Sequence, residues 1–316
     1  MMAALTAVLI VLSWYMPLFS VVGVFACGVP MACLAARHGI RVTLTAMAAA
    51  YGVSALATGS LLSPFSVMLM SVIPGAVAGH FLGRRRPFFA GLFAVCLAVC
   101  AGWLAELLVI DKIIGGEGVA GMLAEMTEQL KKSADAVSGL LPAESMGGID
   151  PSEFVKTLTD TFEYTLRLYF PSIVIVSSML IGYIIIRLSG FVIKRARLCE
   201  IETVPFSCLK APASMTCIMV LVYLALMFMK ENTALWSVLA NVVFVLYTIV
   251  VLCGLSFVDS KLAKHLKSSA LRVFIYVFVF FAASFALSII MNVLVIIGIL
   301  DSTHDYRKLG SEMRHD

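Results

Sequence analysis

Residues 1–36 decide the fold class: MMAALTAVLIVLSWYMPLFSVVGVFACGVPMACLAA, a stretch without a charged side chain. A single helix of this length would extend about 54 Å at ~1.5 Å per residue, whereas the hydrocarbon core of a bilayer is about 30 Å thick. Pro17 interrupts the stretch, and Trp14 and Tyr15 are residue types that favour the membrane–water interface. The stretch therefore predicts two short membrane-spanning helices, over residues 1–15 and 18–36.

The composition of the whole chain extends this interpretation. Of its 316 residues, 61% are apolar and 13% are charged, while a soluble domain has about 25% charged residues. The mean hydropathy is +1.01. So few charges cannot cover a surface that faces water, which excludes a soluble enzyme, a nucleic-acid-binding protein and a disordered chain. Further uncharged runs of spanning length lie at residues 42–62, 64–83, 87–105, 168–186, 211–229, 232–258 and 273–300.

We therefore expect an all-α, polytopic membrane protein with about nine transmembrane helices, or eight if the first run does not span. The basic residues form four clusters, at Arg37/Arg41, Arg84–Arg86, Lys194–Lys210 and Lys261–Arg272. With nine spans and a cytoplasmic N-terminus, all four clusters fall on the cytoplasmic side, as the positive-inside rule requires. This arrangement predicts a protein of the cytoplasmic (inner) membrane, with the lipid bilayer as its surroundings. It places the C-terminal tail outside, and one miscounted span would move the tail to the other side.

The predicted organisation has five parts. They are helices 1–5 in residues 1–110, an outer segment in 111–166, helix 6 in 167–197, helices 7–9 in 198–300 and a polar tail in 301–316.

The outer segment differs from the rest of the chain. It holds ten acidic and four basic residues, and its apolar residues recur at helical spacing. Asp150, Pro151 and Glu153 are typical of a helix start. We expect an amphipathic helical hairpin on the outer membrane surface. The hairpin either packs only on itself or serves as a lid or a docking element for a partner.

The sequence offers little catalytic chemistry. The eight cysteines form no CxxC motif, the five histidines form no pair at metal-ligand spacing, and no HExxH, GxSxG or Walker lysine motif is present. Deep within the spans the clearest polar residues are Asn241 and Asn292, which are typical of helix–helix contacts. Gly75, Gly79 and Gly83 form consecutive GxxxG steps that favour close packing. We expect no catalytic residue, no metal and no cofactor, and therefore no enzyme.

A resemblance to a known family rests on three short segments. They are Gly298–Lys308 at the end of the last span, Leu166–Pro171 at the start of the sixth, and the proline-bracketed loop Val204–Pro212. Together they resemble the YybS-like family of uncharacterised bacterial multi-pass membrane proteins, which is grouped as a domain of unknown function. The first segment brings Asp301, Asp305 and Arg307 together. This cluster is either a salt-bridged helix end or a functional site.

The first six predicted spans also resemble the S components of energy-coupling-factor transporters, which bind a small molecule and have six helices. The resemblance implies docking on a transmembrane coupling subunit through small residues of the first helix, here Ala3 and Ala7. It implies ligand contacts near the outer helix ends, for which Trp14, Tyr15, Glu106 and Arg167 are the candidates. Three further spans depart from the S-component pattern. The alternative is a membrane scaffold or assembly protein that engages another envelope protein through its outer hairpin.

Overall fold

The predicted all-α fold class is confirmed. The computed structural model describes residues 1–109, 118–138, 151–199, 204–231, 233–266, 268–282, 287–304 and 306–307, and within these ranges it contains helices and connecting turns but no strand. The chain divides into two compact units, Met1–Thr203 and Val204–Asp316. Each unit is described by itself.

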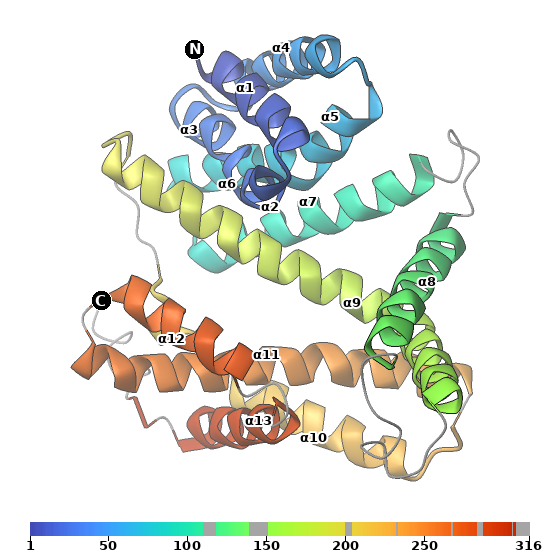
Figure 1. The fold of residues 1–316 in the computed structure, drawn as a ribbon. Coiled ribbons are helices and arrows are strands. Elements are labelled where there is room, and N and C mark those ends of the chain that lie inside the picture. The colour runs from blue at the N-terminus through green and yellow to red at the C-terminus, as the bar shows by residue number, and fades with distance from the viewer. Residues whose placement is uncertain are drawn as a thin grey trace. The chain divides into compact units, whose positions relative to one another are not determined.

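Unit 1 contains a series of helices that follow the predicted spans closely (Figure 1). They are α1 (Met2–Tyr15), α2 (Pro17–Ala26), α3 (Val29–His38), α4 (Ile40–Thr58), α5 (Leu62–Val67), the π-helix η1 (Met68–Val72), α6 (Ile73–Gly83), α7 (Phe88–Val109), α8 (Gly118–Ser138) and α9 (Pro151–Arg195). Pro17 is the first residue of α2, so the predicted break lies where its ring forbids a continuous helix. The predicted second span, 18–36, is divided into α2 and α3 by a turn at Cys27 and Gly28, although both residues keep right-handed helical dihedral angles.

Small residues bring α3 and α6 into close contact. Side chains added at Gly75, Gly79 and Gly83 would collide with the backbone of Gly28, Ala32 and Ala36, respectively. Residue numbers rise together along both helices, so α3 and α6 run parallel. The GxxxG steps in α6 therefore serve close packing inside unit 1.

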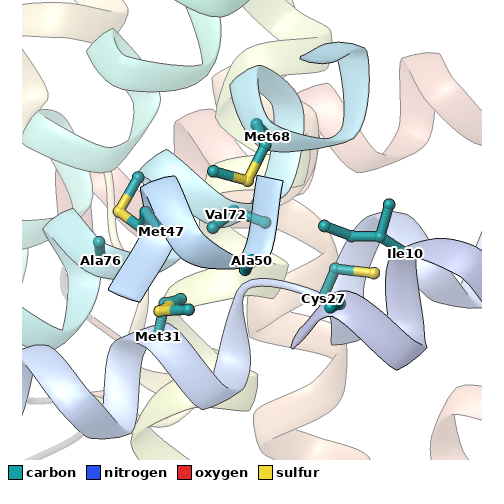
Figure 2. Close-up of a cluster of buried hydrophobic side chains, with 9 residues drawn as sticks. Ile10, Cys27, Met31, Met47, Ala50, Met68, Val72 and Ala76 are labelled. Carbon is teal, nitrogen blue, oxygen red and sulfur yellow. The ribbon is translucent and has the colours of Figure 1, made fainter. Parts of the chain in front are cut away.

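The core of unit 1 forms where α1, α3, α4 and the η1–α6 segment meet. Its buried residues are Ala7, Ile10, Cys27, Met31, Met47, Ala50, Met68, Val72 and Ala76, most of which are labelled in Figure 2. Methionine suits this position because its unbranched side chain fills the irregular gaps left between helices lined by small residues.

The outer segment contains α8 and the first part of α9. At 45 residues, α9 is about 68 Å long, which exceeds the ~30 Å hydrocarbon thickness. Leu123 of α8 and Val155 of α9 are buried, and the two helices pack together (Figure 1). The predicted hairpin therefore packs on itself along one apolar face. The residues between α8 and α9, which include the predicted cap at Asp150, lie outside the described residues.

Unit 2 contains the short 3₁₀ helix η4 (Phe206–Cys208), followed by α10 (Ala213–Met227), α11 (Ala234–His265), α12 (Ser269–Ala282) and α13 (Leu287–His304). Gly254 of α11 packs against Leu294 and Gly298 of α13, and the Tyr247 hydroxyl donates to Asn292 Oδ1 at 3.3 Å. Residue numbers again rise together, so α11 and α13 run parallel. The other predicted mid-span asparagine, Asn241, donates to the Ser237 carbonyl oxygen of its own helix.

This parallel pair corrects the predicted topology of the chain's last part. Within the described residues the run 273–300 contains α12 and α13, and α13 runs parallel to α11 where a single returning helix would run antiparallel. Arg307 contacts the carbonyl oxygens of Ser207 and Leu209, in the loop that the sequence assigns to the cytoplasmic side. The start of the tail therefore lies beside this loop, so the predicted cytoplasmic loop and the predicted outer tail do not agree with each other.

The apolar surfaces fit a membrane protein. Five helical segments are long and apolar enough to cross a bilayer, Ile40–Thr58, Leu62–Gly83, Phe88–Val109, Glu153–Arg195 and Ala234–His265. Shorter apolar helices lie at Met2–Tyr15, Ala213–Met227 and Ser288–His304. Along α7 the side chains of Phe89, Phe93, Leu97, Leu104 and Leu108 are more than half exposed. An exposed stripe of this kind is unfavourable in water and matches lipid.

Candidate functional sites

The four predicted ligand contacts occupy separate positions in unit 1. Trp14 and Tyr15 are exposed at the end of α1, and the Tyr15 hydroxyl donates to the Ala57 carbonyl oxygen of α4 at 3.3 Å. Arg167 forms an exposed ion pair with Glu163, one turn earlier on α9, at 2.7 Å. Glu106 accepts a hydrogen bond from Ser66. Within the described residues, none of these bonds joins one predicted contact to another.

The bond between Ser66 and Glu106 follows from the way α5, η1 and α7 pack. Gly102 of α7 lies so close to the Leu69 carbonyl oxygen that an added Cβ would stand 2.7 Å from it. Glu106 lies one turn further along α7 and Ser66 about one turn earlier in its own segment, because the two segments run antiparallel. The small residue at 102 therefore lets the two helices approach closely enough for this bond.

The predicted docking residues Ala3 and Ala7 line a groove between α1 and α4. The groove has a volume of about 510 Å³ and is lined by Ala3, Ala4, Ala7, Val8, Val11, Leu12, Tyr15, Ala49, Ala50, Val53 and Ala57. None of these residues is charged, and Tyr15 alone among them has a polar side-chain atom. Ala7 and Ala50 are buried at its floor, while Ala4 and Ala49 are exposed. The structure thus places both docking residues in a shallow apolar groove.

In unit 2 the structure brings two of the family-like segments together at Arg307. The guanidinium Nε donates to Asp301 Oδ2 at 3.0 Å, and Nη2 contacts the same oxygen. Nη1 donates to the Ser207 carbonyl oxygen at 2.7 Å, and Nη2 donates to that of Leu209 at 2.9 Å. The side chains of Arg307 and Asp301 are 5% and 2% exposed. We call Asp301, Arg307 and the carbonyl groups of this loop the Arg307 cluster.

The helices of unit 2 complete the Arg307 cluster. Ser256 of α11 accepts from Arg307 Nη1 at 2.9 Å and donates to the Phe206 carbonyl oxygen at 2.7 Å. Thr216 and Ser302 share a hydrogen bond of 2.8 Å between α10 and α13. The cluster therefore ties the loop, α10, α11 and the end of α13 together. Asp305, the third predicted member, lies outside the described residues.

A second buried ion pair joins α11 to α12. Asp259 is 5% exposed, its Oδ1 lies 3.1 Å from Arg272 Nε, and the Tyr276 hydroxyl donates to the same oxygen at 2.9 Å. No local sequence pattern pairs these residues, because Asp259 and Arg272 are 13 positions apart on different helices. The one sequence feature that pointed to this site is that Asp259 is an acidic residue next to an apolar run.

The comparisons with known proteins agree with this architecture. The family described as "Predicted membrane protein (DUF2232)" matches residues 4–302, which is most of the chain. The chain belongs to this family. The DUF2232 match includes Glu106, Asp301 and the residues of the α1–α4 groove except Ala3, and it stops before Arg307. The predicted membership of an uncharacterised multi-pass membrane family is confirmed.

The chain is also similar to "Uncharacterized protein YybS" of Bacillus subtilis (strain 168), at 22% identity over 94% of this chain and 92% of that protein. The similarity extends over both units. No solved structure matches the chain. The DUF2232 family therefore identifies a membrane protein, and any more specific function has to be argued from the sites.

Proposed function

We propose that this protein is a non-enzymatic membrane subunit that binds a small molecule and docks on a transmembrane coupling partner, as an S component does. The observation that carries the proposal is the apolar groove between α1 and α4, which contains Ala3 and Ala7. Lipid tails are as apolar as the side chains of a membrane helix, so no hydrophobic effect drives two such helices together. They associate instead through close van der Waals packing at small residues. The groove supplies six alanines for such packing: Ala3, Ala4, Ala7, Ala49, Ala50 and Ala57.

The lining of the groove also indicates what it would accept. Without a charged side chain it offers nothing to a polar ligand or a headgroup, whereas an apolar helix of the partner would fill it. The small-molecule site would lie elsewhere in unit 1, near the predicted outer helix end that carries Glu106. The docking surface and the ligand site are then separate, as a transport-associated subunit requires.

Filling the groove tests the proposal. The substitution Ala49→Phe places a large side chain in the groove at an exposed position. Ala48→Phe is the matched control, because Ala48 is the exposed neighbour on α4 that does not line the groove. Each variant would be purified from its native membrane with a mild detergent. We expect the wild type and Ala48→Phe to retain a transmembrane coupling subunit together with its ATPase, and Ala49→Phe to lose both. Equal recovery with all three proteins would refute the proposal.

One observation favours the alternative role as a scaffold or assembly protein. Met126, Phe154 and Leu158 in the α8–α9 hairpin are each about 40% exposed, and by the predicted topology they lie outside the hydrocarbon. An exposed apolar face in water is typical of a partner-binding surface. Deletion of residues 112–165 tests this role: a scaffold would lose its envelope partners, whereas unchanged partners would exclude it.

A further inference from the structure

A polar cluster at the junction of α5 and α7 has hydrogen-bonding capacity that the protein leaves unused. Ser63 and Ser66 are three positions apart on α5, and Trp103 and Glu106 are three positions apart on α7, so each pair shares a helix face. Ser66 donates to Glu106. The Ser63 hydroxyl oxygen and the Trp103 indole nitrogen are buried and have no hydrogen-bond partner within the described part of the chain. We call these four residues the Glu106 cluster.

Unsatisfied groups of this kind are costly. A buried donor without an acceptor loses its hydrogen bonds to water and gains none in return. Ser63 and Trp103 lie on the two segments that the Ser66–Glu106 bond holds together. The arrangement therefore resembles a site whose remaining bonds are made by a bound molecule.

The charge of Glu106 is also uncompensated. Residues 42–83 and 87–109, which include both helices of the cluster, contain no lysine or arginine. Among the residues that the structure describes, no base forms an ion pair with Glu106, and Arg167 pairs with Glu163 instead. A partly buried carboxylate at the end of a membrane helix favours a cation as its partner.

The backbone beside the cluster is unusual. The π-helix η1, Met68–Val72, begins directly after α5 and packs against α7 near Trp103. A π-turn inside a helix is rare and occurs frequently at functional sites. In this protein the π-helix lies between Ser66 and the tightly packed part of α6. It therefore shifts the helical register of the residues that follow it in the Leu62–Gly83 segment.

We propose that the Glu106 cluster binds a small organic cation that carries a hydrogen-bond acceptor beside its ammonium or amidinium group. The cationic group would pair with the Glu106 carboxylate, and the acceptor would take the Trp103 indole N–H. A metal ion fits less well, because it has no acceptor for an indole donor. The inference rests on the proposed function, in which unit 1 binds a small molecule, and it adds the chemical class of that molecule.

Three related probes test the two requirements separately. The probe 3-(aminomethyl)pyridine has both a cationic group and an acceptor, benzylamine lacks the acceptor, and 3-pyridylmethanol lacks the charge. Binding to the full-length purified protein would be measured by isothermal titration calorimetry at neutral pH. We expect the first probe to bind about tenfold or more tightly than either of the others, since benzylamine lacks the hydrogen bond to the indole N–H and 3-pyridylmethanol lacks the ionic contact with Glu106.

Two variants assign each preference to one residue. Glu106→Gln, which keeps an oxygen that accepts from Ser66, should abolish the preference for the charged probe over 3-pyridylmethanol. Trp103→Phe should abolish the preference for the pyridine over benzylamine and leave the charge preference intact. Glu125→Gln on α8 is the control, because it removes an exposed acid outside the cluster and should change neither preference.

The outcomes separate this inference from the proposed function. Equal binding of the three probes to the wild type would overturn the cationic class and leave small-molecule binding standing. Preferences that survive in Glu106→Gln and Trp103→Phe would place the site elsewhere and overturn the inference. Absence of saturable binding by all three probes would also overturn it. The proposed function fails on its own test, when Ala49→Phe retains the coupling subunit.

Discussion

Unit 1 and unit 2 each contain a pair of parallel helices in close contact, but different forces hold the two pairs. Between α3 and α6, three successive contacts join glycine to glycine or alanine, and the contact residues are small and apolar. Between α11 and α13, the contact includes Gly254 and Gly298 and ends in the buried Arg307 cluster. Similar helix geometry is therefore stabilised by close packing in one unit and by packing plus buried ionic bonds in the other.

This difference shows the two ways in which helices can associate in lipid. Close packing at small residues needs no desolvation, but it fails as soon as one side chain grows. A buried ion pair tolerates changes around it. Removal of one partner is strongly destabilising, because the other charge stays buried without compensation. Each of the four predictions that follow addresses one part of this contrast, from the largest expected effect to the smallest.

The largest expected effect is all-or-none and concerns the topology of unit 2. In a cysteine-free background, Lys210→Cys and Tyr306→Cys should both react with a membrane-impermeant maleimide in the same vesicle orientation. Glu231→Cys, at the other end of α11, should react in the opposite orientation. The reason is that parallel α11 and α13 require a return crossing between them. Labelling of positions 306 and 231 in the same vesicle orientation would instead mean that residues 273–300 cross the membrane as a single span.

Removing Arg307 should destabilise unit 2 by about 3–5 kcal/mol, because Arg307→Ala leaves the Asp301 carboxylate buried without its cation. Thermal unfolding in detergent, followed by the fraction of monodisperse protein on size-exclusion chromatography, would measure the loss. Arg167→Ala is the control, since Arg167 belongs to an exposed pair that contributes about 0–1 kcal/mol. Arg307→Ala and Arg167→Ala melting alike would show that the cluster is not a source of stability.

In unit 1 a single methyl group should have a smaller but clear effect. Gly79→Ala forces a Cβ against the Ala32 backbone, so α3 and α6 must separate, at a cost of about 1–3 kcal/mol. Gly52→Ala is the matched control, because Gly52 lies within α4 with no atom near its added Cβ. The control should be neutral or stabilising, since alanine favours a helix more than glycine does. The same melting assay compares the two, and equal effects would exclude the packing explanation.

The sequence predicts much of this architecture because membrane insertion depends on local properties. Each of the features used for the prediction, such as an uncharged run, Pro17 or the acidic hairpin, concerns only one or two helices. The helices α1, α4, α7 and α10 lie where the uncharged runs predict them. The GxxxG steps predict a close contact but not its partner, because Gly28, Ala32 and Ala36 belong to a run full of small residues.

The sites depend on long-range pairing, which local patterns do not contain. Arg307 binds backbone carbonyl groups about 100 positions earlier in the chain. Every residue has a backbone carbonyl, so the residue types do not show which ones accept a hydrogen bond. The sequence selected Asp301 and Arg307 through resemblance, and it selected Glu106 as an acid near a helix end. It missed Ser63, Ser66 and Trp103, because serine and tryptophan near a helix end are usual in membrane helices. The parallel direction of α13 was missed because the run 273–300 carries no charge and no proline that would divide it.

The smallest expected effect concerns α8, which the sequence predicts to lie outside the membrane and which carries an exposed ion pair. Lys132 donates to Glu128 one turn earlier at 2.7 Å, and this hydrogen bond and the charge of Lys132 lower the pKa of the Glu128 carboxyl from its ordinary value. Glu128 raises the pKa of Lys132 for the same reason. A carboxyl with a lowered pKa stabilises the fold above its ordinary pKa of 4.5, and this contribution is lost as the pH falls through the lowered value.

Lys132→Gln should therefore speed hydrogen exchange in α8 slightly at neutral pH and have no effect under acidic conditions, where Glu128 is protonated in both proteins. Exchange measured by mass spectrometry on peptides from α8 would follow the difference, after correction for the intrinsic pH dependence of exchange. High salt should also remove it, because an exposed pair is screened. A difference that persisted in high salt or in acid would mean that Lys132 stabilises α8 through its aliphatic stem. Both units would then depend on packing, with ionic bonding confined to the buried Arg307 and Asp259 pairs.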